Sequence, residues 1–493
     1  MQYGPSADTE GLLSVSAQDR GAEGAFMKQK CPIAGRCGGC PWADVPYEIQ
    51  LARKSAYIRK LLAPFGVRSE DCVPGPEEGC RNKVHLVFGW DKGQTRVGFF
   101  AGGSARFVPA KECPMHGEWF PALARALEAW ANAQHLPPYD PRSGKGTLRF
   151  AAGRYLGGKL MLTVVSQRER VPGLPALHQA LEETVGETSL WLNVNDRRDS
   201  AVFSRNFRHI AGPRGLEGEM LGVRFRLSPE SFFQVNEGMA ARLYTRIVDL
   251  ARESGVQQVL DAYSGIGITS LLFARGGMSV VSVEQVPAAV AEARRLAEEN
   301  GLSDSIRALC GDCARVLPGL RLAGETLFFV DPPRRGLGES VCRTILRFGP
   351  KHMIYLSCGP EALARDLRTL TRGGYRVVSA QPWDLFPNTG HVETICLLSK
   401  LNAKQHIEIN LDMDELDLTD AEKKATYQEI KDYVLEHSGL KVSSLYIAQV
   451  KQKCGIIERE NYNKPKSEDA KQPQCPPDKE KAIKEALTHF GMI

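Results

Sequence analysis

The chain has 493 residues, of which 43% are apolar and 25% are charged. These proportions are ordinary for a globular protein and exclude a mainly disordered or a collagen-like chain. We expect no membrane span, because no run of about 18 apolar residues occurs, and a cytoplasmic protein with a flexible leader over residues 1–30, because that segment lacks the basic start and apolar centre of a secretory signal.

The formal net charge of +5 is unevenly distributed along the chain. Residues 401–493 carry 14 basic and 17 acidic residues, whereas residues 1–400 carry 49 basic and 41 acidic ones. The basic surplus therefore lies in the main body of the chain. A surplus of this kind permits a polyanionic partner without identifying one.

Thirteen cysteines, an odd number, are too few for a disulfide scaffold in a chain of this length. In a reducing compartment, clustered cysteines favour metal ligands or nucleophiles. Three follow the spacing Cys-x5-Cys-x2-Cys and a fourth precedes a proline; the four are Cys31, Cys37, Cys40 and Cys113. Four thiolates can hold zinc or an iron–sulfur cluster, and the spacing leaves both open. Cys72 and Cys80 lie nearby in the sequence, and we expect them in the core.

The first half of the chain reads as a β-rich region. A helix is predicted at Tyr47–Leu62 and another over residues 115–135, from apolar residues at helical spacing. Apolar runs broken by glycine turns predict strands over residues 83–109, 147–152, 159–165 and 189–194. We therefore treat residues 31–229 as one β-rich region with the cysteine cluster at its start.

From residue 230 the pattern changes to strand, turn and helix in alternation. Strands are predicted at Gln258–Ala262, Ser279–Glu284, 326–331 and His352–Ser357, with 392–398 closing the unit. Helices are predicted over residues 286–300 and 361–371. Alternation of this kind predicts an α/β unit over residues 230–400, with a parallel sheet covered by helices.

A glycine turn follows the first of these strands. Gly265 and Gly267 come directly after the apolar residues 259–262, and an acid, Glu284, ends the next strand. Glycines let a ligand approach the backbone, and an acid at that place can bond ribose hydroxyls. Ser270 stands where a dinucleotide fingerprint has its third glycine, which favours an adenosyl ligand without a pyrophosphate.

Reactive side chains follow the later strands, at the edge where an open parallel sheet has its chemistry. Asp331 is followed by two prolines that stiffen the chain. Cys358 lies on a strand-to-helix turn, where we expect the helix dipole to lower its pKa. Glu393 begins the last strand and could serve as a general base. Nucleophile, base and nucleotide turn are thus predicted at one edge of one sheet.

Taken together with Phe232-Phe233-Gln234-Val235-Asn236, these motifs resemble the RNA uracil-5-methyltransferase family. They resemble more closely its iron–sulfur branch, which modifies 23S ribosomal RNA. The resemblance covers about residues 31–400. It implies a Rossmann-like class I methyltransferase domain, an N-terminal iron–sulfur and β-rich RNA-binding domain, and a four-iron four-sulfur (4Fe-4S) cluster in preference to zinc.

The resemblance also implies a role for each site residue. The cluster ligands match Cys31, Cys37, Cys40 and Cys113. Positions that contact S-adenosylmethionine, or hold the target base near it, match Gln234, Tyr263, Glu284, Asp312 and Asp331. Cys358 matches the nucleophile and Glu393 the base. Ile268 departs from the family, which commonly has Asn at that position.

The implied reaction begins with addition of the Cys358 thiolate to carbon 6 of uracil, which makes carbon 5 nucleophilic enough to take a methyl group. The target uridine must be unpaired or flipped out of its stack. We expect 23S ribosomal RNA as the substrate and a monomeric enzyme. Two alternatives remain: the same reaction on a transfer-RNA T-loop uridine, and a non-catalytic iron–sulfur RNA-binding protein.

The C-terminal extension, residues 401–493, lies outside the resemblance to the family core. An acidic stretch over residues 412–420 precedes a predicted helix at 421–436, and Gly439 separates it from a second at 442–453. Residues 461–479 are expected to form a loop. The extension is therefore predicted to be small and α-rich, either helix-turn-helix-like and facing nucleic acid or, as we favour, a packing or partner-binding appendage.

Overall fold

The computed structural model describes residues 31–199, 201–322, 325–401, 427–454, 475–490 and 492. The chain divides into two compact units, Met1–Gln405 and His406–Ile493. None of the described helices combines the length and the apolar character needed to cross a membrane. The expected leader, residues 1–30, lies outside the described residues.

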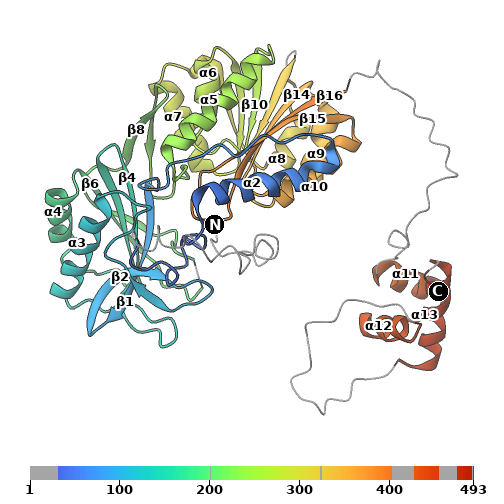
Figure 1. The fold of residues 1–493 in the computed structure, drawn as a ribbon, viewed down its shortest axis with the longest axis horizontal. Helices are drawn as coiled ribbons and strands as arrows, with labels where there is room; N and C mark the ends of the chain where they lie inside the picture. The colour runs from blue at the N-terminus through green and yellow to red at the C-terminus, as the bar shows by residue number, and fades with distance from the viewer. Residues whose placement is uncertain are drawn as a thin grey trace. The chain divides into compact units, whose positions relative to one another are not determined.

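The first sheet of the larger unit has seven strands and confirms that the N-terminal part is β-rich (Figure 1). Their order is β3-β2-β1-β4-β5-β6-β7, and all neighbours are antiparallel except β5 and β6. The strands are β1 (Lys83–Asp91), β2 (Gln94–Phe100), β3 (Phe107–Pro109), β4 (Leu148–Leu156), β5 (Lys159–Ser166), β6 (Thr188–Val194) and β7 (Phe207–Ala211).

One face of this sheet is covered by helices α3 (Trp119–Ala133) and α4 (Leu174–Thr184). Alternate residues of β1, Val84, Leu86 and Phe88, point into this core, as the period of a strand requires. Helix α4 joins β5 to β6. Because parallel neighbours need a crossover connection, this helix explains the single parallel pair.

The second sheet forms the α/β layer that was predicted. Its order is β12-β11-β10-β13-β14-β16-β15. The strands are β10 (Gln258–Ala262), β11 (Ser279–Glu284), β12 (Ile306–Cys310), β13 (Thr326–Val330), β14 (His352–Ser357), β15 (Tyr375–Trp383) and β16 (Glu393–Lys400). Helix α5 (Glu237–Glu253) precedes these strands, and the helices between them are α6 (Ile268–Arg275), α7 (Pro287–Glu299), α8 (Cys313–Val316), α9 (Gly338–Phe348) and α10 (Pro360–Arg372).

The prediction of a parallel sheet was wrong for one strand, β16, which runs opposite to the other six. β16 runs antiparallel to β14, and β15 runs antiparallel to β16. The reason is the short connection between β15 and β16, residues 384–392, which has no crossover helix and so cannot join parallel neighbours. In addition, β12 and β15 were not predicted from the sequence.

Two segments from outside residues 230–400 complete the core of this layer. Helix α2 (Tyr47–Leu62) precedes the first sheet in the chain yet packs against α10, burying Ile58 and Leu62 (Figure 1). The hairpin of β8 (Leu216–Met220) and β9 (Val223–Leu227) packs into the core under α5 and α6. The larger unit is therefore held together by segments that cross between its two sheets.

The smaller unit contains α11 (Tyr427–Ser438), α12 (Ser444–Lys453) and α13 (Pro477–His489), with an apolar core of its own. Helix α13 corrects the prediction of a loop over residues 461–479, because it begins at Pro477, and proline suits a first helical position. Residues 421–426 of the first predicted helix and residues 461–474 lie outside the described part of the chain. The Ser443 side chain accepts a hydrogen bond from the Tyr446 backbone and caps α12.

Candidate active site

The glycine turn after β10 has the predicted open shape. Gly265 and Gly267 both have positive φ angles, 56° and 85°, and Tyr263 shares this conformation at 67°. The Gly265 backbone donates a hydrogen bond to Glu284 Oε2 at 3.1 Å, and the Val286 backbone donates to Glu284 Oε1 at 2.8 Å. Glu284 therefore holds the turn, and each of its oxygens keeps a lone pair for a further donor.

Asp261, the last acid before this turn, received no role from the sequence. Its Oδ2 accepts hydrogen bonds from Thr269 at 2.7 Å and Ser270 at 2.5 Å, whereas its Oδ1 is buried and has no partner. Burial raises the pKa of Asp261 to about 6. A buried acceptor without a donor is costly, so this atom fits a ligand that brings a donor to the turn.

A cavity of about 250 Å³ opens beside the turn, at the carboxyl ends of the parallel strands. Tyr263 and Asp312, two of the residues predicted to bind the cofactor, line this cavity together. Asp312 also accepts a hydrogen bond from the Ala314 backbone at 2.8 Å and caps α8. Pro333 and Arg335 close the cavity from the loop that follows β13.

The loop after β13 is tied down by Asp366 on α10. Asp366 Oδ2 accepts hydrogen bonds from the Leu337 backbone at 2.7 Å and from the Tyr355 hydroxyl at 2.8 Å. Gly336 has a φ of 77°, and a Cβ there would lie 2.4 Å from the same oxygen, so this position requires glycine. The anchored loop holds Asp331, whose pKa burial raises to about 7, with a further rise from Asp261.

Cys358 and Glu393 are brought together by the pairing of β14 with β16. In the register of these antiparallel strands Ser357 faces Thr394, so Cys358 just after β14 and Glu393 at the start of β16 lie at the same sheet edge. Burial raises the pKa of both groups, and the negative charge of Asp331 raises both further. The Arg334 guanidinium acts in the opposite direction on both. The predicted nucleophile, the predicted base and Asp331 thus share one enclosed site.

The expectation that the helix dipole lowers the pKa of Cys358 was wrong in this structure. Its pKa is raised, first by burial and then by the Glu393 and Asp331 carboxylates. Helix α10 begins with Pro360, which has no backbone N–H to offer the thiolate. Among the charged neighbours of this thiol, the Arg334 guanidinium is the one that lowers its pKa and so favours the thiolate.

Gln234 lies in the buried segment that leads into α5. Asn236 accepts a hydrogen bond from the Met239 backbone at 3.2 Å and caps this helix. Two turns along, the buried hydroxyl of Tyr244 bonds to the Gln234 side chain and faces Asp331 and Glu393. Tyr244 was not predicted from the sequence, because it falls on the apolar stripe of α5 and carries no signal of its own there.

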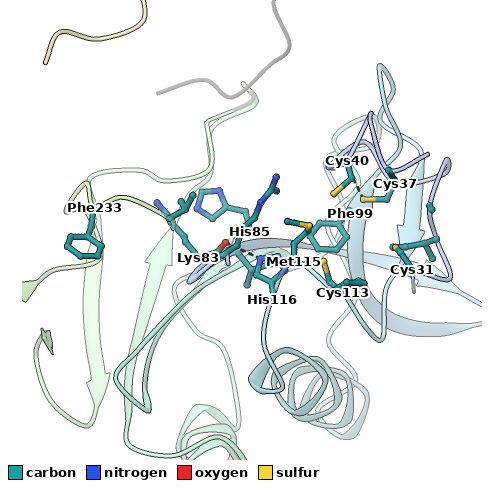
Figure 2. A pocket seen from close by; sticks show the side chains of 18 of the residues that line it. Cys31, Cys37, Cys40, Lys83, His85, Phe99, Cys113, Met115, His116 and Phe233 are labelled. Carbon is teal, nitrogen blue, oxygen red and sulfur yellow. Dashed lines mark hydrogen bonds between the residues drawn. The ribbon is translucent and has the colours of Figure 1, made fainter. Parts of the chain in front are cut away.

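The four cysteines of the predicted cluster line a second cavity, of about 290 Å³. Figure 2 shows their side chains together at one side of it, from two separate chain segments. Burial raises the pKa of Cys40 to about 11 and of Cys113 to about 12, and the neighbouring thiols add to both rises. Arg81 lowers both, and its buried Nε has no hydrogen-bond partner.

A half-buried arginine beside four thiols fits an anionic thiolate centre, which would need a compensating cation. Among the described residues, however, no three His, Cys, Asp or Glu side chains are arranged to hold a metal ion. The metal assignment of these cysteines therefore stays a prediction. Cys72 and Cys80 are buried and do not line this cavity.

Backbone hydrogen bonds tie the cysteine segments to the Gln234 segment. The backbone of Gly79 donates to Pro114 and that of Arg81 to Met115, both at 2.8 Å. Next along the chain, the Asn82 backbone donates to Val235 at 2.8 Å. The segment that follows Cys113 and the segment that holds Gln234 are therefore both paired with residues 79–82.

Known proteins resemble this chain over both of its sheets. The family model described as tRNA (uracil-5-)-methyltransferase matches residues 216–401. An uncharacterized RNA methyltransferase from Halalkalibacterium halodurans is 32% identical over 387 residues, which are 76% of this chain and 84% of the relative. One from Gloeobacter violaceus is 35% identical over 388 residues, 76% of this chain and 83% of the relative.

The Pyrococcus abyssi tRNA (uracil-54, C5)-methyltransferase, solved with S-adenosyl-L-homocysteine, has a similar fold. It superposes with a TM-score of 0.63 at 24% identity, over 73% of this chain and 86% of that one. Three findings agree: the fold is shared, the family model matches, and two RNA methyltransferases match over most of their length. They also agree with the reactive residues found at one edge of the sheet. The chain belongs to the RNA uracil-5-methyltransferase family.

Proposed function

We propose that this protein methylates carbon 5 of a uridine in 23S ribosomal RNA through a covalent adduct between Cys358 and carbon 6 of the base. The observation that supports this most is the antiparallel pairing of β14 with β16, which sets Cys358 beside Glu393 next to the anchored Asp331. S-adenosylmethionine supplies the methyl group as an electrophilic sulfonium. Asp261, Tyr263, Glu284 and Asp312 are the residues we assign to holding it.

In this mechanism the Cys358 thiolate forms a bond to carbon 6, and the electron pair of the carbon 5–carbon 6 double bond moves toward the carbonyl at carbon 4. Carbon 5 then takes the methyl group. Glu393 removes the proton that remains on carbon 5, the double bond re-forms, and the carbon 6–sulfur bond breaks to return the thiolate. Gln234, held by Tyr244, orients the base, and Asp331 stands beside both reacting groups.

The rate is expected to rise with pH across the neutral range. Thiol addition needs the deprotonated form of Cys358, and proton removal needs the deprotonated form of Glu393. Burial raises the pKa of each group, and it raises the pKa of nearby Asp331 to about 7. Groups with raised pKa values hold their protons at low pH, so activity is lost on the acid side. Initial rates at subsaturating RNA between about pH 5.5 and pH 8.5 would check this, and a flat profile would contradict the shared burial of these groups.

An RNA substrate must present its uridine outside a base stack. Five exposed arginines are suited to phosphate contacts: Arg168 and Arg170 after β5, Arg208 on β7, and Arg205 and Arg214 on either side of β7. We assign residues 31–229 to RNA binding and residues 230–400 to methyl transfer on this basis. Phe232 is 54% exposed and lines the cysteine cavity, and we assign it to contact with the RNA, whereas Phe233 is buried in the core.

The four cysteines are proposed to hold a four-iron four-sulfur cluster, with zinc as the alternative. Protein purified without oxygen is expected to contain iron and acid-labile sulfide in equal amounts, and Cys113→Ser is expected to lose most of both. Metal analysis and visible absorption would check this. Stoichiometric zinc without sulfide would contradict the cluster and favour a tetrahedral thiolate site.

Transfer RNA is the second candidate substrate. It is favoured by the family model, whose description names tRNA, and by the shared fold of the Pyrococcus abyssi tRNA enzyme. Mass-spectrometric nucleoside mapping of RNA from a host without this gene, and from the same host after restoration, separates the two. We expect a 5-methyluridine in 23S RNA to disappear and return. A change confined to the transfer-RNA T-loop would overturn the ribosomal substrate. If neither RNA changed, the proposal that this protein is an RNA methyltransferase would be overturned.

A further inference from the structure

The loop between β15 and β16 leads directly into Glu393 and is centred on Asn388. This residue is only 1% exposed and has a positive φ of 64°, a conformation that Asn tolerates better than most residues. The preceding Asp384 bonds to Lys54 of α2 at 2.6 Å. After Asn388, the Thr389 hydroxyl bonds back to Phe386 at 2.8 Å, and the His391 backbone donates to that hydroxyl at 3.2 Å. The loop is therefore closely folded up to the residues before Glu393.

Asn388 connects this loop to both cysteine-bearing segments. Its backbone carbonyl accepts a hydrogen bond from the Trp42 backbone at 3.0 Å, two residues after Cys40. Its side-chain Nδ2 donates to Met115 Sδ at 3.3 Å, two residues after Cys113. One buried residue thus contacts both segments, the first through its backbone carbonyl and the second through its side chain.

Gln50 of α2 completes the connection. The Asn388 backbone donates to Gln50 Oε1 at 2.8 Å, and Gln50 Nε2 donates to Asn388 Oδ1 at 3.1 Å. Gln50 Nε2 also lies 2.8 Å from the Val45 carbonyl and 3.3 Å from the Trp42 carbonyl, at the end of the cysteine loop. The Gln50 amide is 1% exposed, so these bonds have no competition from bulk water.

We propose that Asn388 is a positioning residue that sets the place of Glu393 according to the arrangement of the two cysteine-bearing segments. The inference rests on the proposed function, in which Glu393 removes the proton from carbon 5. Cys358 lies outside this loop, between the end of β14 and the start of α10. A displaced Asn388 should therefore impair proton removal and leave thiol addition and methyl transfer largely intact.

The test uses Asn388→Gly in the full chain, because glycine accepts the positive φ and the substitution removes only the side-chain bonds. Gln50→Ala breaks the same connection from α2. Asn300→Ala is the matched control, since Asn300 makes three comparable hydrogen bonds, to Arg224 and Leu296, at a distant corner between β9 and α7. Glu393→Gln shows what loss of the base looks like.

Two RNA substrates separate the steps. With ordinary uridine, a failed proton removal leaves methylated RNA bound to Cys358, which a denaturing gel detects as a protein–RNA adduct. With 5-fluorouridine no proton is available on carbon 5, so every enzyme that completes addition and methyl transfer is trapped. We expect Asn388→Gly and Gln50→Ala to lower turnover by about 10²-fold, to accumulate the uridine adduct, and to form the 5-fluorouridine adduct at the wild-type rate.

Hydrogen exchange gives a readout that does not depend on catalysis. We expect faster exchange over residues 384–392 in Asn388→Gly and unchanged exchange in β10 to β14. An Asn388→Gly enzyme with wild-type turnover and no uridine adduct would overturn the inference. So would an Asn388→Gly enzyme that forms neither the uridine nor the 5-fluorouridine adduct, because thiol addition or methyl transfer would then have failed. If Glu393→Gln itself fails to trap uridine RNA, the proposed mechanism fails instead, and the two failures remain distinguishable.

Discussion

Cys358→Ala is expected to abolish RNA methylation, with a loss of turnover on the order of 10⁴-fold or more. Without the sulfur no bond forms at carbon 6, so carbon 5 never becomes nucleophilic enough to take a methyl group. The variant keeps every hydrogen bond that anchors the neighbouring loop, because these run through Asp366, Leu337 and Tyr355. Transfer of a labelled methyl group to RNA measures the effect directly.

Cys310→Ala is the matched control for this substitution. Cys310 is exposed at the end of β12, at the same edge of the sheet, and its removal should leave methylation unchanged. S-adenosylmethionine affinity should also stay within about 2-fold of wild type in Cys358→Ala, because Cys358 does not line the cofactor cavity. Full methylation by Cys358→Ala would reject the covalent mechanism and leave the family assignment untouched.

Separating the buried ion pair of Lys54 with Asp384 is expected to destabilise the larger unit by about 3–5 kcal/mol. Both side chains are fully buried, their charged atoms lie 2.6 Å apart, and Lys54 Nζ also donates to the Phe386 carbonyl at 3.2 Å. Burial lowers the pKa of Lys54, while the Asp384 carboxylate opposes that shift. In Lys54→Met the carboxylate is left without its cation in a dry environment. Urea unfolding of the variant and of wild type measures the loss.

The double variant Lys54→Met with Asp384→Leu distinguishes a stranded charge from simple loss of packing. Replacing both partners by apolar side chains should recover most of the lost stability, because no unpaired charge remains. An exposed pair, Arg343 with Glu339, has side chains that are each 70% accessible and provides the control. Its removal should cost less than about 1 kcal/mol. Equal losses in the single and double variants would show that the charge itself is unimportant.

Several elements were predictable because local sequence dictates them. β10, β11, β14 and α2 have the predicted bounds, since each is a short apolar run, or an apolar stripe at helical spacing, between clear turn residues. β12 and β15 were missed for the opposite reason. β15 alternates buried and exposed residues on a sheet edge and includes Pro382, and β12 is short and partly exposed. Their strand character comes from their neighbours in the sheet.

The electrostatics of the site could not be predicted from residue order. A cysteine before a helix suggested a lowered pKa, yet the enclosed carboxylates of Glu393 and Asp331 raise it. Tyr244 and Asn388 each belong to a patterned segment, an apolar helix stripe and a polar turn, that gives no sign of their contacts. The contacts of Asn388 join residues hundreds of positions apart, as between Gln50 and Asn388.

The amino-acid sequence by itself determined the α/β layer, the open glycine turn and the candidate residues at the strand ends, because apolar periodicity, glycine and proline act within a few neighbouring residues. Only the tertiary structure decided how those residues meet. The short β15–β16 connection forces β16 to run antiparallel, so the start of that strand, with Glu393, lies at the edge where β14 ends with Cys358. Strand direction depends on pairing between distant segments, and pairing exists only in the folded chain.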